Sequence, residues 1–279
     1  GVAARWIRSD LHEEASLRGL TVVTPTEVLA THLLEVIKAN MARLLTLRGL
    51  RRLLDEFTNL SDPQRSEANR RLLDELVPDK VPPDLLLSVL RLLLDERVSV
   101  RNLPLILEAI AELRNLAAAP ETVCEHVRRR LSFQLVAELR RPDGSVPLVQ
   151  LAPEWESLFA RYQIEGERGQ QDVALPPDQF NRLAAALGDR LAEIAGQGVS
   201  VALVTSSLRR RFLRTVLDTR GLTNPVLSYD EIGTEARPSA GDVVMLGKLR
   251  CKVMRSHSRG IGVQFLDIPD PEALRRYFG

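Results

Sequence analysis

The sequence predicts a helix-rich α+β protein of several subdomains, with a central helical bundle flanked by small α/β subdomains and a C-terminal β-hairpin followed by a short helix. Three observations support this fold class. Apolar residues recur at three- and four-residue steps through the first half of the chain. Prolines fall at the boundaries of these runs. Strand-like and helix-like segments alternate in the last third.

The composition narrows the classes of function. The chain has 279 residues, enough for about two domains, with 44% hydrophobic and 27% charged residues and a formal net charge of +1. Such a balance gives no overall attraction to nucleic acid, so no nucleic-acid partner is expected. The two cysteines do not form a disulfide framework, and no window is apolar enough to predict a membrane span.

The first elements precede residue 24. Asp10 and Glu13 have the spacing of a capping box, and Gly19 is expected to end a short helix that Trp6 packs beneath. The β-prone run of residues 19–23 predicts a short strand. This strand leads directly into the helix around which the rest of the chain is arranged.

That helix lies within residues 21–45. Thr24 is the predicted N-cap, Pro25 suits the first helical position, and Glu27 can complete a capping box. Thr31, Glu35 and Lys38 lie on the polar side and are candidates for partner docking; the alternative is an ordinary solvated helix face. An apolar stripe, expected to be buried, is formed by Leu29, Leu33, Val36, Ile37, Met41 and Leu44.

Residues 47–141 are predicted to form several helices of ordinary length. Asp62 followed by Pro63 is a start signal, and Pro78 is a stop signal. The tetrapeptide Leu-Leu-Asp-Glu begins at Leu53, Leu72 and Leu93, but the flanking residues do not repeat, which favours a compact bundle over an α-solenoid. A continuous helix is predicted over residues 121–140, with Arg128, Arg129 and Arg130 on a solvated surface.

The last third predicts an α/β subdomain. Residues 146–151, 199–204 and 226–229 are strand-like, and residues 153–162, 177–195 and 207–219 are helical. A strand, a crossover helix and a second strand favour a parallel pair. Residues 163–172 are expected to be a mobile surface loop. Two interpretations remain open, an anion site or a solvated basic face, for Ser206, Ser207, Arg209, Arg210, Arg211 and Arg214.

Short motifs occur in a specific order from residue 1 to residue 232. They include Trp6-Ile7, GLTVV at residues 19–23, ATHL at residues 30–33, VSVRN at residues 98–102 and VLSYDEI at residues 226–232. In this order they resemble the cytoplasmic domain of the type III secretion export-gate family. That family comprises the large membrane protein of flagellar and injectisome secretion systems, whose cytoplasmic part forms a ring under the pore.

The resemblance implies a platform on the cytoplasmic face of the bacterial inner membrane, which acts by binding and not by catalysis. Secretion chaperones, export substrates and other export-apparatus proteins are the implied partners, and residues 47–141 are implied to form a nonameric ring. Thr31 occupies the position of a threonine that contributes to the family's docking surface. The acidic and aromatic partners of that threonine, and the membrane segment, are expected upstream of Gly1, so we expect this chain alone to recognise substrates weakly.

The resemblance and the composition together predict five segments. Residues 243–279 resemble the last hairpin and helix of a PilZ domain, a module that commonly binds cyclic di-GMP, but Ser256 and Ile261 stand where its ligand-binding motif needs other residues. Docking on a partner or a neighbouring subunit is the expectation for this tail. The segments are a partial N-terminal α/β subdomain (1–46), the helical ring-forming subdomain (47–141), the C-terminal α/β subdomain (142–232), a linker (233–242) and the PilZ-like tail (243–279).

No catalytic, metal or cofactor site is predicted. The four histidines are scattered without zinc-ligand spacing, and the phosphate-binding and nucleophile-elbow motifs are missing. His32 adjoins Thr31, but adjacent helical positions diverge and do not activate a nucleophile. An enzyme is therefore the third hypothesis, after the export-gate platform and a helical peptide-binding adaptor unrelated to secretion.

Overall fold

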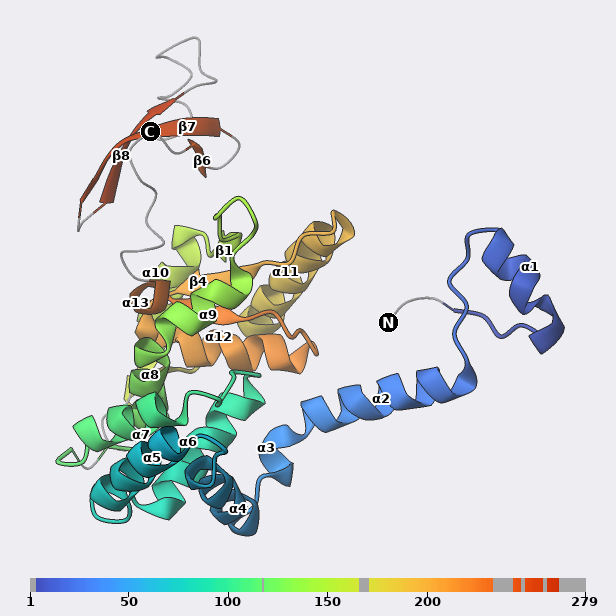
Figure 1. The fold of residues 1–279 in the computed structure, drawn as a ribbon. Coiled ribbons are helices and arrows are strands. Elements are labelled where there is room, and N and C mark those ends of the chain that lie inside the picture. Colours follow the sequence, from blue (N-terminus) through green and yellow to red (C-terminus); the bar gives the residue numbers. More distant parts are fainter. Residues whose placement is uncertain are drawn as a thin grey trace. The chain divides into compact units, whose positions relative to one another are not determined.

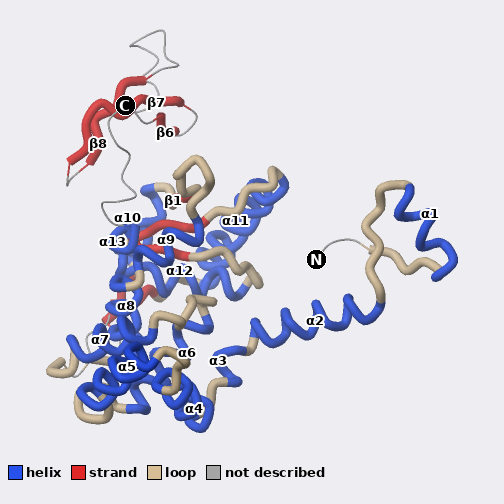
Figure 2. The backbone as a smooth tube through the Cα atoms, in the orientation of Figure 1, coloured by secondary structure: helices blue, strands red, loops and turns tan. Residues whose placement is uncertain are grey.

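The computed structural model describes residues 4–116, 118–165, 171–232, 243–246, 249–257 and 260–265 (Figure 1). The chain divides into two compact units, Gly1–Arg101 and Asn102–Gly279. Helices dominate both units, and the described strands all belong to the second (Figure 2). The predicted helix-rich α+β class is confirmed.

The first unit begins with a 3-10 turn, Ser9–Leu11, and helix α1, His12–Leu17. The capping box predicted here is wrong, because Asp10 pairs with Arg8 instead, with Nη2 and Oδ2 2.9 Å apart. The prediction that Trp6 packs beneath the helix is also wrong. Trp6 is 82% exposed, and α1 has no buried residue that could cover it. Gly19, with φ of +75°, ends the helical segment as predicted.

Helix α2, Pro25–Ala39, begins with the predicted capping box. The Glu27 amide donates to Thr24 Oγ1 at 3.2 Å, and the Thr24 amide donates to Glu27 Oε2 at 2.7 Å. The helix ends at Asn40, whose side-chain amide donates to the Val36 carbonyl at 2.8 Å, and α3 follows at Met41–Leu44. Residues 19–23 do not form the predicted strand. A strand needs a hydrogen-bonded neighbour, which the described residues do not supply.

The predicted burial of the α2 and α3 apolar stripe is wrong. Its side chains are between 41% and 68% exposed, with Leu29 at the upper limit and Met41 at the lower. Periodicity identifies an apolar face, but it does not identify what covers that face. Within the described part of the chain, this face remains open.

Helices α4, Leu47–Thr58, α5, Pro63–Leu76, and α6, Pro83–Asp95, form the bundle of the first unit. Asp62 caps α5 as predicted, because its Oδ1 accepts from the amides of Gln64 and Arg65 at 3.0 and 3.3 Å. The Arg91 side chain joins α6 to the end of α3 by donating to the Leu45 carbonyl at 2.9 Å. The fully buried core residues are Leu50, Val81, Leu86, Val89, Leu90 and Leu93.

The second unit begins with α7, Leu103–Glu112, α8, Pro120–Arg130, and α9, Ser132–Leu139. The predicted continuous helix over residues 121–140 is thus two helices. The chain breaks at Leu131, whose φ and ψ of −86° and 6° leave the α-helical range. Both helices still bury one side, since Val123, Val127 and Leu135 all lie in the core.

Three parallel strands form the sheet of the second unit, in the order β1-β4-β5. Their bounds are Leu148–Gln150, Ala202–Thr205 and Val226–Ser228. The prediction of a parallel pair joined by a crossover helix is confirmed by β4, α12 (Ser207–Thr219) and β5.

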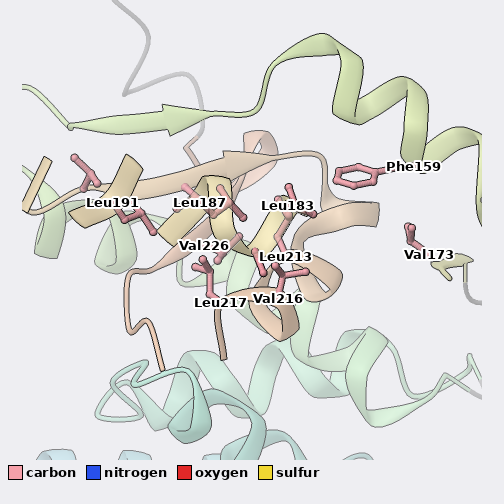
Figure 3. Close-up of a cluster of buried hydrophobic side chains, with 12 residues drawn as sticks. Phe159, Val173, Leu183, Leu187, Leu191, Leu213, Val216, Leu217 and Val226 are labelled. Atoms are coloured by element: carbon pink, nitrogen blue, oxygen red, sulfur yellow. The ribbon is translucent and has the colours of Figure 1, made fainter. Parts of the chain in front are cut away.

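The core of the second unit includes side chains of helices α10, α11 and α12. Helix α10 spans Pro153–Arg161 and α11 spans Pro177–Gly196. Phe159, Leu183 and Leu213 come from the three helices and belong to one cluster of buried side chains with Val226 of β5 (Figure 3). Phe159 also meets Phe212 edge to face, with ring centroids 5.3 Å apart. This packing fixes the N-terminus of α12 relative to the sheet.

The loop predicted over residues 163–172 contains an antiparallel pair, so the prediction is wrong at both ends of the segment. Strand β2, Gln163–Glu165, pairs with β3, Gln171–Val173, and Ile164 lies opposite Asp172. The polar composition of the segment concealed strands of only three residues, which are stabilised by their pairing and by burial of Val173 in the core.

The chain continues into a four-residue helix, α13, Tyr229–Ile232, which the sequence did not predict. The tail forms an antiparallel sheet in the order β6-β7-β8, with bounds Val243–Leu246, Leu249–His257 and Gly260–Phe265. The hairpin of β7 and β8 is as predicted, and β6 adds a strand. The predicted linker at residues 233–242 and helix at residues 271–277 lie outside the described residues.

Candidate docking surface

The three predicted docking residues share one exposed side of α2. Thr31, Glu35 and Lys38 follow each other at steps of four and three residues, the spacing of neighbours on a helix surface. All three are exposed. The structure therefore brings them together where another protein can reach them.

Glu35 and Lys38 form an ion pair, with Oε1 and Nζ 2.8 Å apart and both side chains about half exposed. The hydrogen bond from Lys38, and then its positive charge, lowers the pKa of the Glu35 carboxyl below its ordinary 4.5. Glu35 is consequently charged at neutral pH, and the pair offers both signs of charge at one place. Solvent screening keeps such a pair weak, so it can exchange partners easily.

Large apolar side chains surround this polar side on α2. Six of the ten residues from 28 to 37 are Val, Leu or Ile. Contiguous exposed apolar surface rimmed by polar residues is typical of protein interaction sites. We call this region the α2 face, made of Val28, Leu29, Thr31, Leu33, Leu34, Glu35, Val36, Ile37 and Lys38; its apolar members are 42% to 68% exposed.

Sequence reasoning selected the polar part of the α2 face and missed the apolar part. The missed residues were assigned to a core because apolar periodicity normally indicates burial. The composition does carry a signal, because apolar residues extend around more of the helix than one narrow stripe requires. A helix of this kind needs cover on more than one side.

The arginines at the start of α12 form internal contacts. Arg209 and Arg210 are 6% and 0% exposed, so the solvated-face interpretation is wrong for both. Arg209 donates to Gln163 Oε1 at 2.6 Å, Arg210 binds the Glu125 carboxylate, and Ser207 donates to Asp230. Most donors at this helix start are therefore engaged inside the protein, but Arg209 Nη1 is buried without a hydrogen-bond partner among the described residues.

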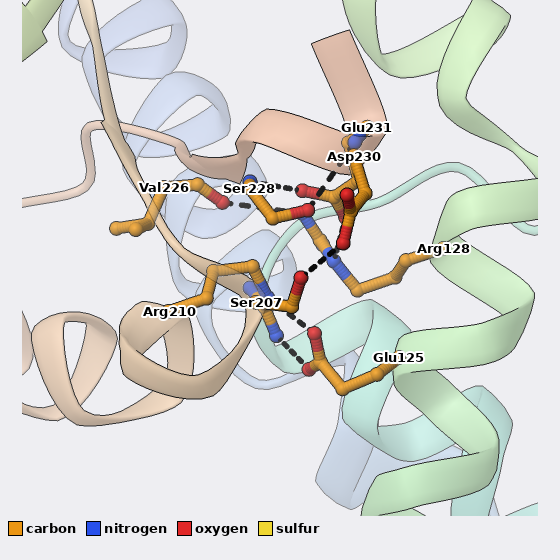
Figure 4. A network of polar contacts seen from close by, with 8 residues as sticks. All are labelled: Glu125, Arg128, Ser207, Arg210, Val226, Ser228, Asp230 and Glu231. Carbon is orange, nitrogen blue, oxygen red and sulfur yellow. Dashed lines mark hydrogen bonds and ion pairs between the residues drawn. The ribbon is translucent and has the colours of Figure 1, made fainter. Parts of the chain in front are cut away.

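Arg128 is also buried, which corrects the prediction of three solvated arginines. Only 2% of it is exposed, and its Nε donates to Glu231 Oε1 at 2.7 Å (Figure 4). Arg129 and Arg130 are exposed as predicted. The local run did not reveal the difference, because Glu231 lies 103 residues further along the chain.

No three His, Cys, Asp or Glu side chains of the described residues gather closely enough to bind a metal ion. Within the same residues, every helix is too short or too polar for a membrane crossing.

The FHIPEP family model matches residues 1–237. Among similar proteins, the flagellar biosynthesis protein FlhA of Caulobacter vibrioides is 38% identical over 238 residues, covering 85% of this chain and 33% of that protein. FlhA of Escherichia coli is 31% identical over 221 residues, covering 78% of this chain and 30% of that protein. The chain thus spans about a third of the length of these relatives.

Solved structures share the fold. A cryo-EM structure of nonameric SctV-C from EPEC aligns with a TM-score of 0.64 at 19% identity, covering 81% of this chain and 66% of that one. The MxiA protein of Shigella flexneri aligns with a TM-score of 0.61 at 24% identity, covering 82% and 68%. CdsV of Chlamydia pneumoniae, in a structure with CdsO, gives 0.64 at 22% identity, covering 83% and 65%. Since the family model covers residues 1–237 of 279, the chain belongs to the FHIPEP family.

Proposed function

We propose that this chain is part of the cytoplasmic platform of a type III secretion export gate, at the inner membrane of a bacterium. The observation that carries the proposal is the family match over residues 1–237, together with relatives named as flagellar biosynthesis proteins. The match favours this hypothesis over a helical adaptor unrelated to secretion. The membrane attachment would come from another part of the full protein.

The platform would work by binding export substrates delivered by chaperones, and the α2 face is our proposed docking surface. Thr31 supplies a hydroxyl on this surface, Glu35 and Lys38 supply both charges, and the flanking leucines supply apolar area. Such a mixture can contact partners of different sequence, because apolar area gives affinity while exchangeable polar contacts adapt to each partner.

The platform would also bind copies of itself. Relatives of known structure include a nonameric ring, and we propose that residues 47–141 form the equivalent contacts here. The limits of the other proposed segments, 1–46, 142–232, 233–242 and 243–279, follow from the sequence. We propose that the PilZ-like tail, whose described strands form a three-stranded sheet, docks on a partner or a neighbouring subunit.

A binding titration tests the docking proposal. Labelled chaperone–substrate complex from the bacterium that encodes this protein is titrated with the 279-residue chain and with Thr31→Asp. A carboxylate at this position must be desolvated when a partner covers the surface, so Thr31→Asp should weaken binding by about tenfold or more. The matched control is Thr215→Asp, which places the same charge on the exposed side of α12. Equal binding by all three proteins, or an equal loss in both variants, would contradict the role of the α2 face.

A further inference from the structure

Two ion pairs join helix α8 to the α/β part of the second unit. The Arg128 and Glu231 side chains are 3% and 1% exposed, and Nε lies 2.7 Å from Oε1. The Arg210 side chain is 1% exposed and donates through Nε to Glu125 Oε2 at 2.7 Å, with a second contact from Nη2 to Oε1. Figure 4 shows both pairs side by side.

In the two pairs, α8 supplies the acidic residue of one and the basic residue of the other. Glu125 and Arg128 are three residues apart on α8, so they project from one side of the helix. Their partners are of opposite type and come from different elements, Arg210 from the first turn of α12 and Glu231 from α13. An acid and a base on one helix therefore meet a base and an acid on two others, and the group is neutral overall.

Glu231 also stabilises the turn that follows β5, through hydrogen bonds with Ser228. Its Oε2 accepts from the Ser228 amide at 2.6 Å, and its amide donates to Ser228 Oγ at 3.2 Å, which is a capping box that closes the end of β5. Its other carboxylate oxygen binds Arg128. One carboxylate thus serves both the turn after β5 and the attachment of α8, so neither contact can open without affecting the other.

Arg128 makes a third connection. Its Nη2 donates to the Val226 carbonyl in β5 at 3.2 Å. The side chain therefore reaches from α8 to the strand and to α13 at the same time. Because a sheet strand is rigid, this contact fixes the position of α8 along the strand and not only its distance from it.

Charge in a buried site is expensive, and apolar residues of the same volume often give equal stability. The two oppositely charged pairs add a fixed alignment of α8 against its neighbours, because the opposite charges meet in one register only. The apolar side chains Val123 and Val127 on the same helix could also pack one position away. We propose that Glu125, Arg128, Arg210 and Glu231 form a clamp, here called the α8 clamp, that holds α8, α12, β5 and α13 as one rigid block. Any rearrangement of α8 against the sheet then requires the whole clamp to open.

Hydrogen exchange followed by mass spectrometry tests the clamp on the complete 279-residue chain. Glu231→Gln removes the charge and keeps the side-chain size. The clamp predicts that the amides of α8, residues 120–130, exchange about tenfold faster or more in this variant, together with those of residues 226–232, although α8 itself is unchanged. Faster exchange limited to residues 226–232 would overturn the proposal.

Glu112→Gln is the matched control. Glu112 lies on α7 and contacts the same helix from the exposed side, with Oε2 2.6 Å from His126 Nε2 and Oε1 3.4 Å from Arg130 Nη2. Removing this surface charge should leave exchange in α8 within about twofold of the unmodified protein, because exposed pairs contribute little. An equal effect of both variants would show that the clamp has no special role.

A second variant covers the possibility that Glu231→Gln does not fold. Arg128→Met combined with Glu231→Gln removes both charges, leaves neither unpaired and keeps a side-chain oxygen that can accept from the Ser228 amide, so the protein should fold with a melting temperature close to that of the original. The clamp predicts that α8 amides still exchange faster in this double variant, because apolar packing alone does not fix the register. Unchanged protection of α8 would mean that packing alone holds the block together, and the clamp proposal would fail.

Discussion

At the scale of the residue, Glu35 and Lys38 show how a surface contact sets a charge. Lys38 donates to Glu35 Oε1 at 2.8 Å and so favours the carboxylate form. The contribution of this contact to stability is fully present above the ordinary Glu35 pKa of 4.5 and is lost as the pH falls through the lowered value. Glu35, one of the three predicted docking residues, therefore carries its negative charge beside Lys38 at neutral pH.

The Glu35 pKa can be measured by following its side-chain carboxyl carbon by NMR as the pH is lowered. We expect a titration midpoint below 4.5, which returns toward 4.5 in Lys38→Met because the donor is gone. Lys80→Met is the control, since it removes an analogous contact to Glu75 and leaves Glu35 alone. A midpoint that does not respond to Lys38→Met would show that the pair does not form in solution.

The buried arginines mark the limit of sequence reasoning at this scale. Arg128, Arg129 and Arg130 are the same residue type in one run, yet one is buried and two are exposed. The difference comes from Glu231, which only the folded chain brings near Arg128. A charged side chain is buried only where a partner satisfies it, and that partner is not visible in the local sequence.

At the scale of the element, the caps of α2 and α5 and the parallel pairing of β4 with β5 could be predicted, whereas the pairing of β2 with β3 could not. The Thr24 capping box and the Asp62 cap depend on residues within one turn, so the sequence contains them completely. The pairing of β2 with β3 depends on contacts between two separate short segments, and burial of the α2 face depends on a covering surface. The same locality explains why the docking triad was predicted and its apolar surroundings were assigned to a core.

The exposure of α2 predicts an unusual response to leucine truncation. Leu33→Ala should change the free energy of unfolding by less than about 0.5 kcal/mol, as for an exposed side chain. Leu90→Ala, in the fully buried core around α6, should cost about 2–5 kcal/mol. Urea denaturation of both variants measures the difference. A large loss from Leu33→Ala would mean that α2 is covered in solution.

At the scale of the whole molecule, the described chain separates into two units. The helical class and the parallel sheet followed from periodicity and from alternating element types. The division into units depends on contacts between distant residues, which periodicity does not report.

Self-association is the prediction that belongs to this scale. Mass photometry over a range of concentrations should show a shift from the 31.2 kDa chain to closed particles of nine copies, if the ring of the solved relatives is shared. Thr31→Asp should leave this shift unchanged, because the proposed ring contacts lie in residues 47–141. A monomer at every concentration would contradict the ring and leave the docking proposal to be judged separately.

We propose that the protein promotes export by presenting the α2 face to visiting proteins. The most direct test is protein export by a bacterium in which the full-length gene carries Thr31→Asp or Thr215→Asp, measured as secreted substrate in the culture medium. We predict that secretion falls about tenfold or more with Thr31→Asp and stays normal with Thr215→Asp, at equal cellular levels of both variants. Normal secretion with Thr31→Asp would contradict it.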